Sequence, residues 1–172
     1  KNYKKTFVLF PNVPWDAALV GADKLFTNVY EWVSTTIDFF MGKKDFLLII
    51  KIHPSEKKVM ESEKSMHDYI KEKYPKLDEN IKIIPSETTI SPYSLFPFID
   101  VGIVYVGTIG LELAINNIPV ISAGNAHYSN KGFTNDPKNT KQYQQLLKEN
   151  LKPIDDQEIL AKIYGYFHFI KK

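Results

Sequence analysis

The feature that most constrains the fold is a series of five short apolar segments separated by longer stretches with helical periodicity. The segments are residues 6–10, 46–52, 81–84, 101–106 and 120–122, and turn-forming residues follow each of them. Few of them alternate polar with apolar residues, which is typical of strands buried on both faces of a sheet. Strands that alternate with helices predict an α/β fold, with a doubly wound parallel sheet of about five or six strands. We therefore expect a single Rossmann-like domain, flanked by helices, over residues 1–172.

Helical patterns lie between and after these strands. In the first, apolar side chains recur every four residues from Val29 to Met41, before a terminating Gly42. Another begins with Ser91 and Pro92, a favourable N-cap and first-turn residue. The expected helices are residues 26–41, 56–74, 91–96 and 156–166, the last within a carboxy-terminal helical segment, residues 155–172.

The composition narrows the chemistry. The 172 residues contain no cysteine, which excludes disulfides, thiol catalysis and cysteine-based metal sites. They contain no arginine, so lysine, histidine, hydroxyl groups or backbone amides would have to hold an anion. A net charge of +2 without a long basic run predicts no nucleic-acid partner. No apolar run approaches the roughly 20 residues that cross a bilayer, and the first residues do not resemble a signal peptide. We therefore expect a cytoplasmic protein.

Polar and glycine-rich residues follow every predicted strand. Because the carboxyl ends of parallel strands meet at one edge of the sheet, where α/β proteins bind ligands, we expect these residues to lie close together. They are Trp15 and Asp16 after the first strand, His53 and Pro54 after the second, Pro85 and Ser86 after the third, Gly107, Thr108, Ile109 and Gly110 after the fourth, and His127, Tyr128, Lys131 and Gly132 after the fifth.

The turn at residues 107–110 leads from a predicted strand into a helix, where free N–H groups favour an anion. Its glycines would let the backbone approach a phosphate, and the Thr108 hydroxyl could donate to it. A tight turn with Thr108 as N-cap is the structural alternative. A capping box would need an acid where Leu111 stands, so Glu112 is not explained by a cap and could accept hydrogen bonds from a ribose. The turn is neither a dinucleotide fingerprint nor a Walker loop.

Two other segments are candidates for ligand contacts. Pro54 restricts His53 to an extended conformation, so its imidazole could donate to a phosphate or assist a leaving group, although it could also merely cap the next helix. The loop that contains His127, Tyr128, Lys131 and Gly132 could cover a ligand or be a solvated surface loop. Trp15 could pack on a ring at the same edge, and Asp16 could instead cap a helix. No cluster of potential ligands predicts a bound metal.

Taken together, HP, GTIGLE and NAHYSNKGF in this order resemble the carboxy-terminal half of capsule polysaccharide biosynthesis glycosyltransferases, relatives of the Kdo transferases and bacterial sialyltransferases. The resemblance runs from PNVPWDAA to the GFT segment. It implies one half of a GT-B architecture, in which this domain binds the nucleotide-sugar donor. It also implies that His53 and Thr108 contact the donor phosphate and that Glu112 contacts the ribose. Relatives often carry two hydroxyl residues where this chain has Gly107 and Thr108.

The expected function is transfer of a sugar from a CMP- or UDP-linked donor to a surface polysaccharide, with His53 as the catalytic candidate and no cofactor or metal. The resemblance implies a missing amino-terminal acceptor domain, a saccharide or lipid-linked acceptor, and peripheral association with the inner face of the cytoplasmic membrane. Two alternatives stay open. One is a polyol-phosphate transferase that uses a CDP-glycerol type of donor, and the other is a non-catalytic Rossmann-like module.

Overall fold

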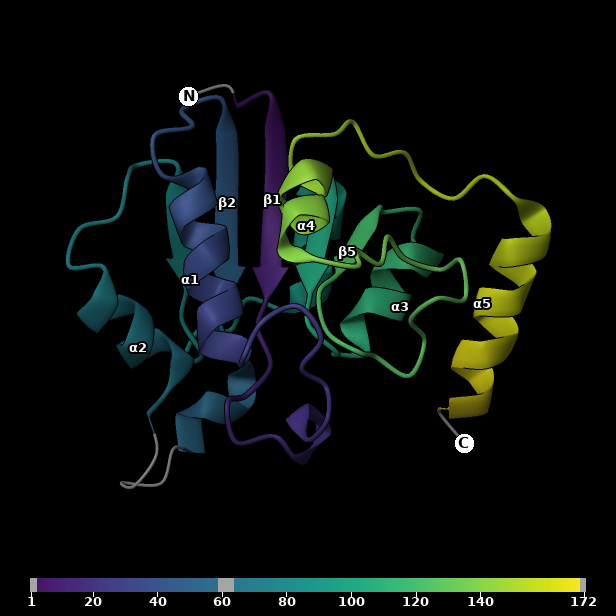
Figure 1. Ribbon diagram of the computed structural model, residues 1–172, viewed down its shortest axis with the longest axis horizontal. Coiled ribbons are helices and arrows are strands. Elements are labelled where there is room, and N and C mark those ends of the chain that lie inside the picture. Colours follow the sequence, from purple (N-terminus) through teal and green to yellow (C-terminus); the bar gives the residue numbers. More distant parts are fainter. Residues whose placement is uncertain (1–2, 59–63, 171–172) are drawn as a thin grey trace.

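The core of the protein is a parallel sheet. The computed structural model describes residues 3–58 and 64–170, and within these residues the sheet has five strands in the order β3-β2-β1-β4-β5 (Figure 1). All five lie where the sequence predicts them, so the expected doubly wound α/β sheet is confirmed. The strands are β1 (Lys5–Phe10), β2 (Phe46–Lys51), β3 (Ile81–Ile84), β4 (Val101–Val104) and β5 (Val120–Ser122).

The central strands are buried on both faces, as their apolar sequences require. Val8 of β1 pairs with Ile49 of β2 on one side and with Gly102 of β4 on the other. All four residues of β4 are buried. A Cβ atom on Gly102 would lie 2.5 Å from Cδ1 of Leu113, so glycine at this position lets the following helix pack closely on the sheet.

Helices pack against the sheet and lie beyond its β5 edge. In Figure 1, α1 and α4 lie side by side against the sheet, α3 lies beside β5, and α5 stands beyond α3 at that end of the molecule. The expected helices near residues 26–41, 91–96 and 156–166 are present, the second as a 3₁₀ segment. The helices are α1 (Val29–Phe40), α2 (Met66–Lys73), α3 (Ile109–Ile115), α4 (Thr140–Leu146) and α5 (Gln157–Ile170), with 3₁₀ segments η1 (Ala17–Leu19), η2 (Pro54–Lys58) and η3 (Pro92–Phe98).

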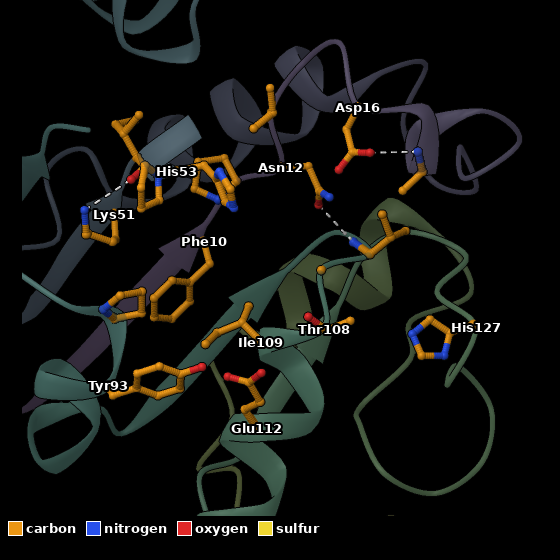
Figure 2. A pocket seen from close by; sticks show the side chains of 18 residues that line it. Phe10, Asn12, Asp16, Lys51, His53, Tyr93, Thr108, Ile109, Glu112 and His127 are labelled. Carbon is orange, nitrogen blue, oxygen red and sulfur yellow. Dashed lines mark hydrogen bonds between the residues drawn. The ribbon is translucent and has the colours of Figure 1, made fainter. Parts of the chain in front are cut away.

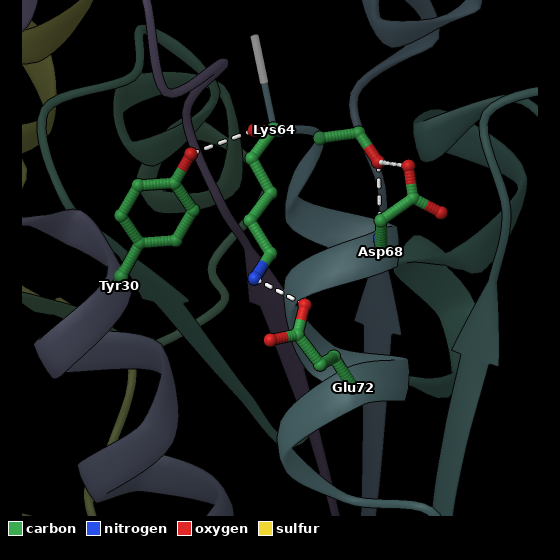
Figure 3. Close-up of polar contacts among 5 residues, drawn as sticks. Tyr30, Lys64, Asp68 and Glu72 are labelled. Carbon is green, nitrogen blue, oxygen red and sulfur yellow. Dashed lines mark hydrogen bonds and ion pairs between the residues drawn. The ribbon is translucent and has the colours of Figure 1, made fainter.

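The expected single helix over residues 56–74 is wrong. The helix α2 begins only at Met66, because Ser65 has an extended backbone and its hydroxyl accepts a hydrogen bond from Asp68 N at 3.0 Å. Glu56 lies in η2, and its Oε2 accepts from Met66 N at 3.0 Å. Residues 59–63 of the expected helix lie outside the described part of the chain. Around the same helix start, the Tyr30 hydroxyl donates to the Lys64 backbone carbonyl, and the Lys64 ammonium pairs with Glu72 (Figure 3).

Glu56 produces a testable pH dependence. Its side chain is 4% exposed, and burial raises its pKa from 4.5 to about 7. As the pH rises, the unfolded chain therefore ionises first, and Glu56 lowers the stability progressively between these two values. The variant Glu56→Gln should match the wild type near about pH 4 and exceed its unfolding free energy by about 2–3 kcal/mol near about pH 8 in urea denaturation.

The control is Glu72→Gln, which removes the negative charge of an exposed carboxyl group rather than a buried one. A Glu56→Gln effect that is the same at both ends of the pH range would contradict the raised pKa.

A buried chain of hydrogen bonds joins α1 to α4, a helix that the sequence patterns did not predict. The Trp32 indole donates to the Tyr143 hydroxyl at 3.0 Å. The Thr36 hydroxyl donates to Trp32 O at 2.8 Å, so in its 2.6 Å contact with Tyr143 it must be the acceptor. Tyr143 is fully buried, and the polar groups of the Trp32, Thr36 and Tyr143 side chains satisfy one another or a backbone carbonyl, as buried polar groups require.

We expect Tyr143→Phe to lower the unfolding free energy by about 1–3 kcal/mol, because it leaves the buried Trp32 N–H without an acceptor. Tyr164 is 55% exposed on α5, and Tyr164→Phe should change stability by less than about 0.5 kcal/mol. Equal effects of the two substitutions in urea denaturation would show that the buried chain does not contribute.

The strand order reverses between β1 and β4. From β1 the chain runs outward to β2 and β3, and then returns to place β4 on the other side of β1. The loops that leave the carboxyl ends of β1 and β4 therefore diverge, and such a switch point is where open α/β sheets bind ligands. No helix in the described ranges is long and apolar enough to cross a membrane.

Candidate functional site

A pocket of about 440 Å³ lies at the switch point, at the carboxyl ends of β1, β2 and β4 (Figure 2). This size is in the range of small-molecule sites. The predicted site residues that line it are Asp16, His53, Gly107, Thr108, Ile109, Glu112 and His127. The predicted residues that do not line it are Trp15, Pro85, Ser86, Gly110, Tyr128, Lys131 and Gly132.

The turn after β4 presents unused hydrogen-bond donors to this pocket. Thr108 occupies the N-cap position of α3, but its side chain makes no capping hydrogen bond. Within the described part of the chain, the backbone N–H groups of Gly107, Thr108 and Ile109 have no acceptor. The capping alternative for the Thr108 side chain is therefore wrong. One hydroxyl and three adjacent N–H groups are available to an anion or another oxygen-rich ligand.

Tyr128 supports this turn from below. Its side chain is fully buried, and its hydroxyl donates to Gly107 O at 2.7 Å. Gly110 makes room for it, because a Cβ atom there would lie 2.4 Å from the Tyr128 hydroxyl oxygen. The second glycine of the turn is thus required by packing against Tyr128, independently of any ligand in the pocket. Tyr128, which the sequence suggested as part of a loop that covers a ligand, is buried behind the pocket lining instead.

His53 presents a defined donor at the end of β2. Its Nδ1 accepts a hydrogen bond from Ser55 N at 3.1 Å, so the ring proton of the neutral form is on Nε2. Partial burial lowers the pKa of His53, the nearby Asp16 raises it, and Lys51 lowers it further, with a net decrease. His53 is therefore neutral at neutral pH. The alternative role of His53 as a helix cap is therefore correct for its Nδ1 atom. The Nε2–H group of the same ring is still available as a donor.

Lys51 is a pocket residue that the sequence analysis missed. Its side chain is 2% exposed, and its ammonium donates to the carbonyl groups of Ile52 at 3.2 Å and Pro85 at 3.5 Å. Among the described residues no carboxylate lies within ion-pair distance of it, and burial lowers its pKa. The signal was its position at the end of the predicted strand, two residues before His53.

Glu112 and Tyr93 form a polar pair in the pocket lining. Glu112 points from α3 toward the Tyr93 hydroxyl of η3 (Figure 2), and the nearby carboxylate raises the pKa of Tyr93. Tyr93 is 56% exposed and was not predicted as a site residue, because it follows no strand directly. A carboxylate beside a phenol can contact two neighbouring hydroxyl groups of a ligand.

Asparagine and aspartate side chains hold the loop after β1. Asn12 is 8% exposed, and its Oδ1 accepts from Val106 N at 3.3 Å, which connects this loop to the end of β4. Asp16 lines the pocket, and its Oδ1 accepts from Ala18 N at 2.9 Å, which confirms its alternative role as a helix N-cap. Trp15 is half-buried outside the pocket lining.

The loop after β5 contributes His127 alone to the pocket lining. Lys131 lies on the α5 side, with its Nζ 5.7 Å from the centre of the Tyr166 ring. Gly132 has a φ of +80°, a left-handed conformation that favours glycine. Pro85 reaches the site only through its carbonyl contact with Lys51, and Ser86 is buried.

Residues 2–167 match the model of a family described as capsule polysaccharide biosynthesis protein. The chain belongs to this family. No curated protein sequence matches it significantly.

Solved structures share the fold. The beta Kdo 2,7 transferase of KpsC from Thermosulfurimonas dismutans is 19% identical, with a TM-score of 0.58 over 94% of this chain and 45% of its own. The beta Kdo 2,4 transferase of the same protein has the same identity and TM-score, over 94% and 44%. A kitacinnamycin glycotransferase is 12% identical, with a TM-score of 0.53 over 99% and 40%. The chain thus spans less than half the length of these proteins, and it has the fold of one half of a GT-B protein.

The contact between Gly110 and Tyr128 can be tested by a double-mutant cycle. Gly110→Ala should lower the unfolding free energy by about 1–3 kcal/mol, because the new methyl group overlaps the Tyr128 hydroxyl. Added to Tyr128→Phe, which removes that oxygen, the same substitution should cost clearly less. The control is Gly165→Ala in α5, where a Cβ would meet nothing within 4 Å, so it should stabilise by about 0.5–1 kcal/mol. Strict additivity in urea denaturation would contradict the contact.

Proposed function

We propose that this domain binds the nucleotide part of an activated sugar and takes part in transferring that sugar to a surface polysaccharide. The observation that carries the proposal is a set of hydrogen-bond donors in the pocket that have no acceptor among residues 3–58 and 64–170. They are the Thr108 hydroxyl and the adjacent backbone N–H groups, and His53 lines the same pocket. Membership of the capsule family supports the biosynthetic setting. The likeness to transferase structures supports the architecture.

The phosphate of the donor is assigned to the turn after β4. Backbone N–H groups and a hydroxyl offer short hydrogen bonds to phosphate oxygens, and the Nε2–H group of His53 adds a neutral donor at the neighbouring strand end. During transfer, the bond between the anomeric carbon and the phosphate oxygen breaks, and its electron pair stays on the phosphate. Donors already in place there stabilise the departing negative charge.

The nucleoside is assigned to the side of the pocket that holds Lys51, Phe10, Tyr93 and Glu112 (Figure 2). The Glu112 carboxylate accepts hydrogen bonds, as ribose hydroxyls require, and the exposed Tyr93 ring offers a surface for stacking. The buried ammonium of Lys51 gains a partner from a carbonyl or phosphate oxygen of the ligand. Both CMP- and UDP-linked donors meet these conditions.

The acceptor is assigned to another part of the enzyme. The pocket has a volume of about 440 Å³, and the chain covers less than half of the transferases that it resembles. We place the saccharide or lipid-linked acceptor, and the group that takes its proton, on a further domain. Action at the inner face of the cytoplasmic membrane is part of the same proposal.

Calorimetric titration with CMP, UDP, CDP and CDP-glycerol tests the proposal. At least one nucleotide should bind, and Thr108→Val and His53→Ala should each weaken it by about 10–100-fold, the cost of a lost hydrogen bond to a charged group. The exposed His168→Ala on α5 should leave the affinity unchanged.

A folded protein that binds none of these nucleotides at millimolar concentration would overturn the proposal. Binding that neither pocket substitution weakens would place the nucleotide elsewhere. A clear preference for CDP-glycerol would redirect the function to polyol-phosphate transfer.

A further inference from the structure

His127 is the residue of the β5 loop that reaches the pocket, and α5 holds it from behind. The Tyr166 hydroxyl lies 2.9 Å from His127 Nδ1 and also donates to the His127 backbone carbonyl at 2.9 Å. The two rings are stacked, with centroids 5.7 Å apart and planes inclined by 26°. In Figure 2 the His127 ring points from its loop toward Thr108.

These two contacts fix the position of the proton on His127. Tyr166 has one hydroxyl proton, and the carbonyl group can only accept, so this proton is committed to the carbonyl. The contact with the ring is then a hydrogen bond only if Nδ1 carries a proton and donates it to the Tyr166 oxygen. In the neutral ring, Nε2 is consequently unprotonated. It makes no hydrogen bond with any residue in the described ranges.

The surroundings keep this ring neutral. Burial lowers the pKa of His127, and the positive charge of Lys131 lowers it further. At neutral pH, Nε2 therefore offers a lone pair, which is a hydrogen-bond acceptor. His53 has the opposite arrangement, because Ser55 N occupies its Nδ1 and leaves the proton on Nε2. The pocket thus has one histidine that donates and one that accepts, each set by a contact outside the pocket.

The helix that supplies Tyr166 is anchored on the same loop. Ile163 is fully buried, and Phe133 is 5% exposed with its ring centre 5.8 Å from that of Tyr166. The Cδ1 of Ile159 would lie 3.6 Å from a Cβ at Gly132. This packing fixes where the Tyr166 hydroxyl lies, so the hydrogen bonds to His127 do not depend on a loose surface side chain.

We propose that Tyr166 is a positioning residue that makes His127 Nε2 an acceptor for a hydroxyl group on the sugar or polyol attached to the nucleotide. The inference rests on the proposed function, which places the phosphate at Thr108. An unprotonated Nε2 can receive a hydrogen bond from a hydroxyl group, whereas a carboxylate or phosphate oxygen has no proton to give it. This wall of the pocket therefore selects for hydroxyl groups next to the phosphate and against anionic ones.

The experiment compares Tyr166→Phe with Tyr164→Phe, a matched loss of an exposed hydroxyl from the same helix. Long-range proton–nitrogen NMR of the histidine rings should show a proton on Nδ1 of His127 and on Nε2 of His53 in the wild type. Tyr166→Phe should shift His127 toward the Nε2-protonated form and leave His53 unchanged. The Tyr164→Phe spectrum should match the wild type at both rings. A wild-type His127 that carries its proton on Nε2 would overturn the inference.

The second readout is the ratio of the affinity for a nucleotide that carries a sugar or glycerol to the affinity for the same nucleotide without it. CMP is compared with CMP-N-acetylneuraminate, UDP with UDP-glucose, and CDP with CDP-glycerol, and the pair with the largest wild-type gain is used. Tyr166→Phe should reduce this gain about 3–10-fold, the cost of one neutral hydrogen bond, while the bare nucleotide binds within about twofold of the wild type. Tyr164→Phe should alter neither value.

The outcomes separate the two proposals. No gain in any wild-type pair, or a gain that Tyr166→Phe leaves intact, would overturn the role of Tyr166 while nucleotide binding stands. Failure of all bare nucleotides to bind would overturn the proposed function and the ligand assigned to His127 with it.

Discussion

The pairing of β1 with β4 is the interaction on which the rest of the structure depends. It places the carboxyl end of β4 beside that of β1, although about 90 residues separate the two strands in sequence. The pairing brings Asn12 Oδ1 within hydrogen-bond distance of Val106 N, and this contact holds the turn at residues 107–110 beside the loop that follows β1. The same strand order places His53 on the neighbouring strand end, so the donors of two separate motifs line one pocket.

The glycine turn shows how one sequence motif can serve two purposes. Gly107 precedes N–H groups that are unused within the described structure, as expected for a phosphate site. Gly110 is required for packing instead, because the hydroxyl of Tyr128 occupies the space that a side chain at this position would need. The prediction of a turn followed by a helix was correct. The reason for its second glycine is a tertiary contact with Tyr128, from the loop after β5, which the sequence did not predict.

Hydrogen-bond polarity is a second property that sequence motifs do not carry. His53 and His127 are chemically identical side chains, yet their neighbours leave opposite groups facing the pocket. For His53 the neighbour is local, the N–H group two residues ahead. For His127 it is Tyr166, 39 residues away on α5, a helix whose aromatic face had no assigned purpose in the sequence. Local spacing could have suggested the first arrangement and not the second.

The sequence by itself determined the parallel α/β class, because buried strands and amphipathic helices each have a periodicity that local side chains impose. It also placed His53, Thr108 and Glu112 at the ligand edge, since parallel strands end together. Only the tertiary structure showed Lys51 and Tyr93 in the pocket, divided residues 56–74 between η2 and α2, and moved Tyr128, Lys131 and Pro85 out of the lining. These features depend on which distant segments pack against each other, and no local pattern of residues encodes that choice.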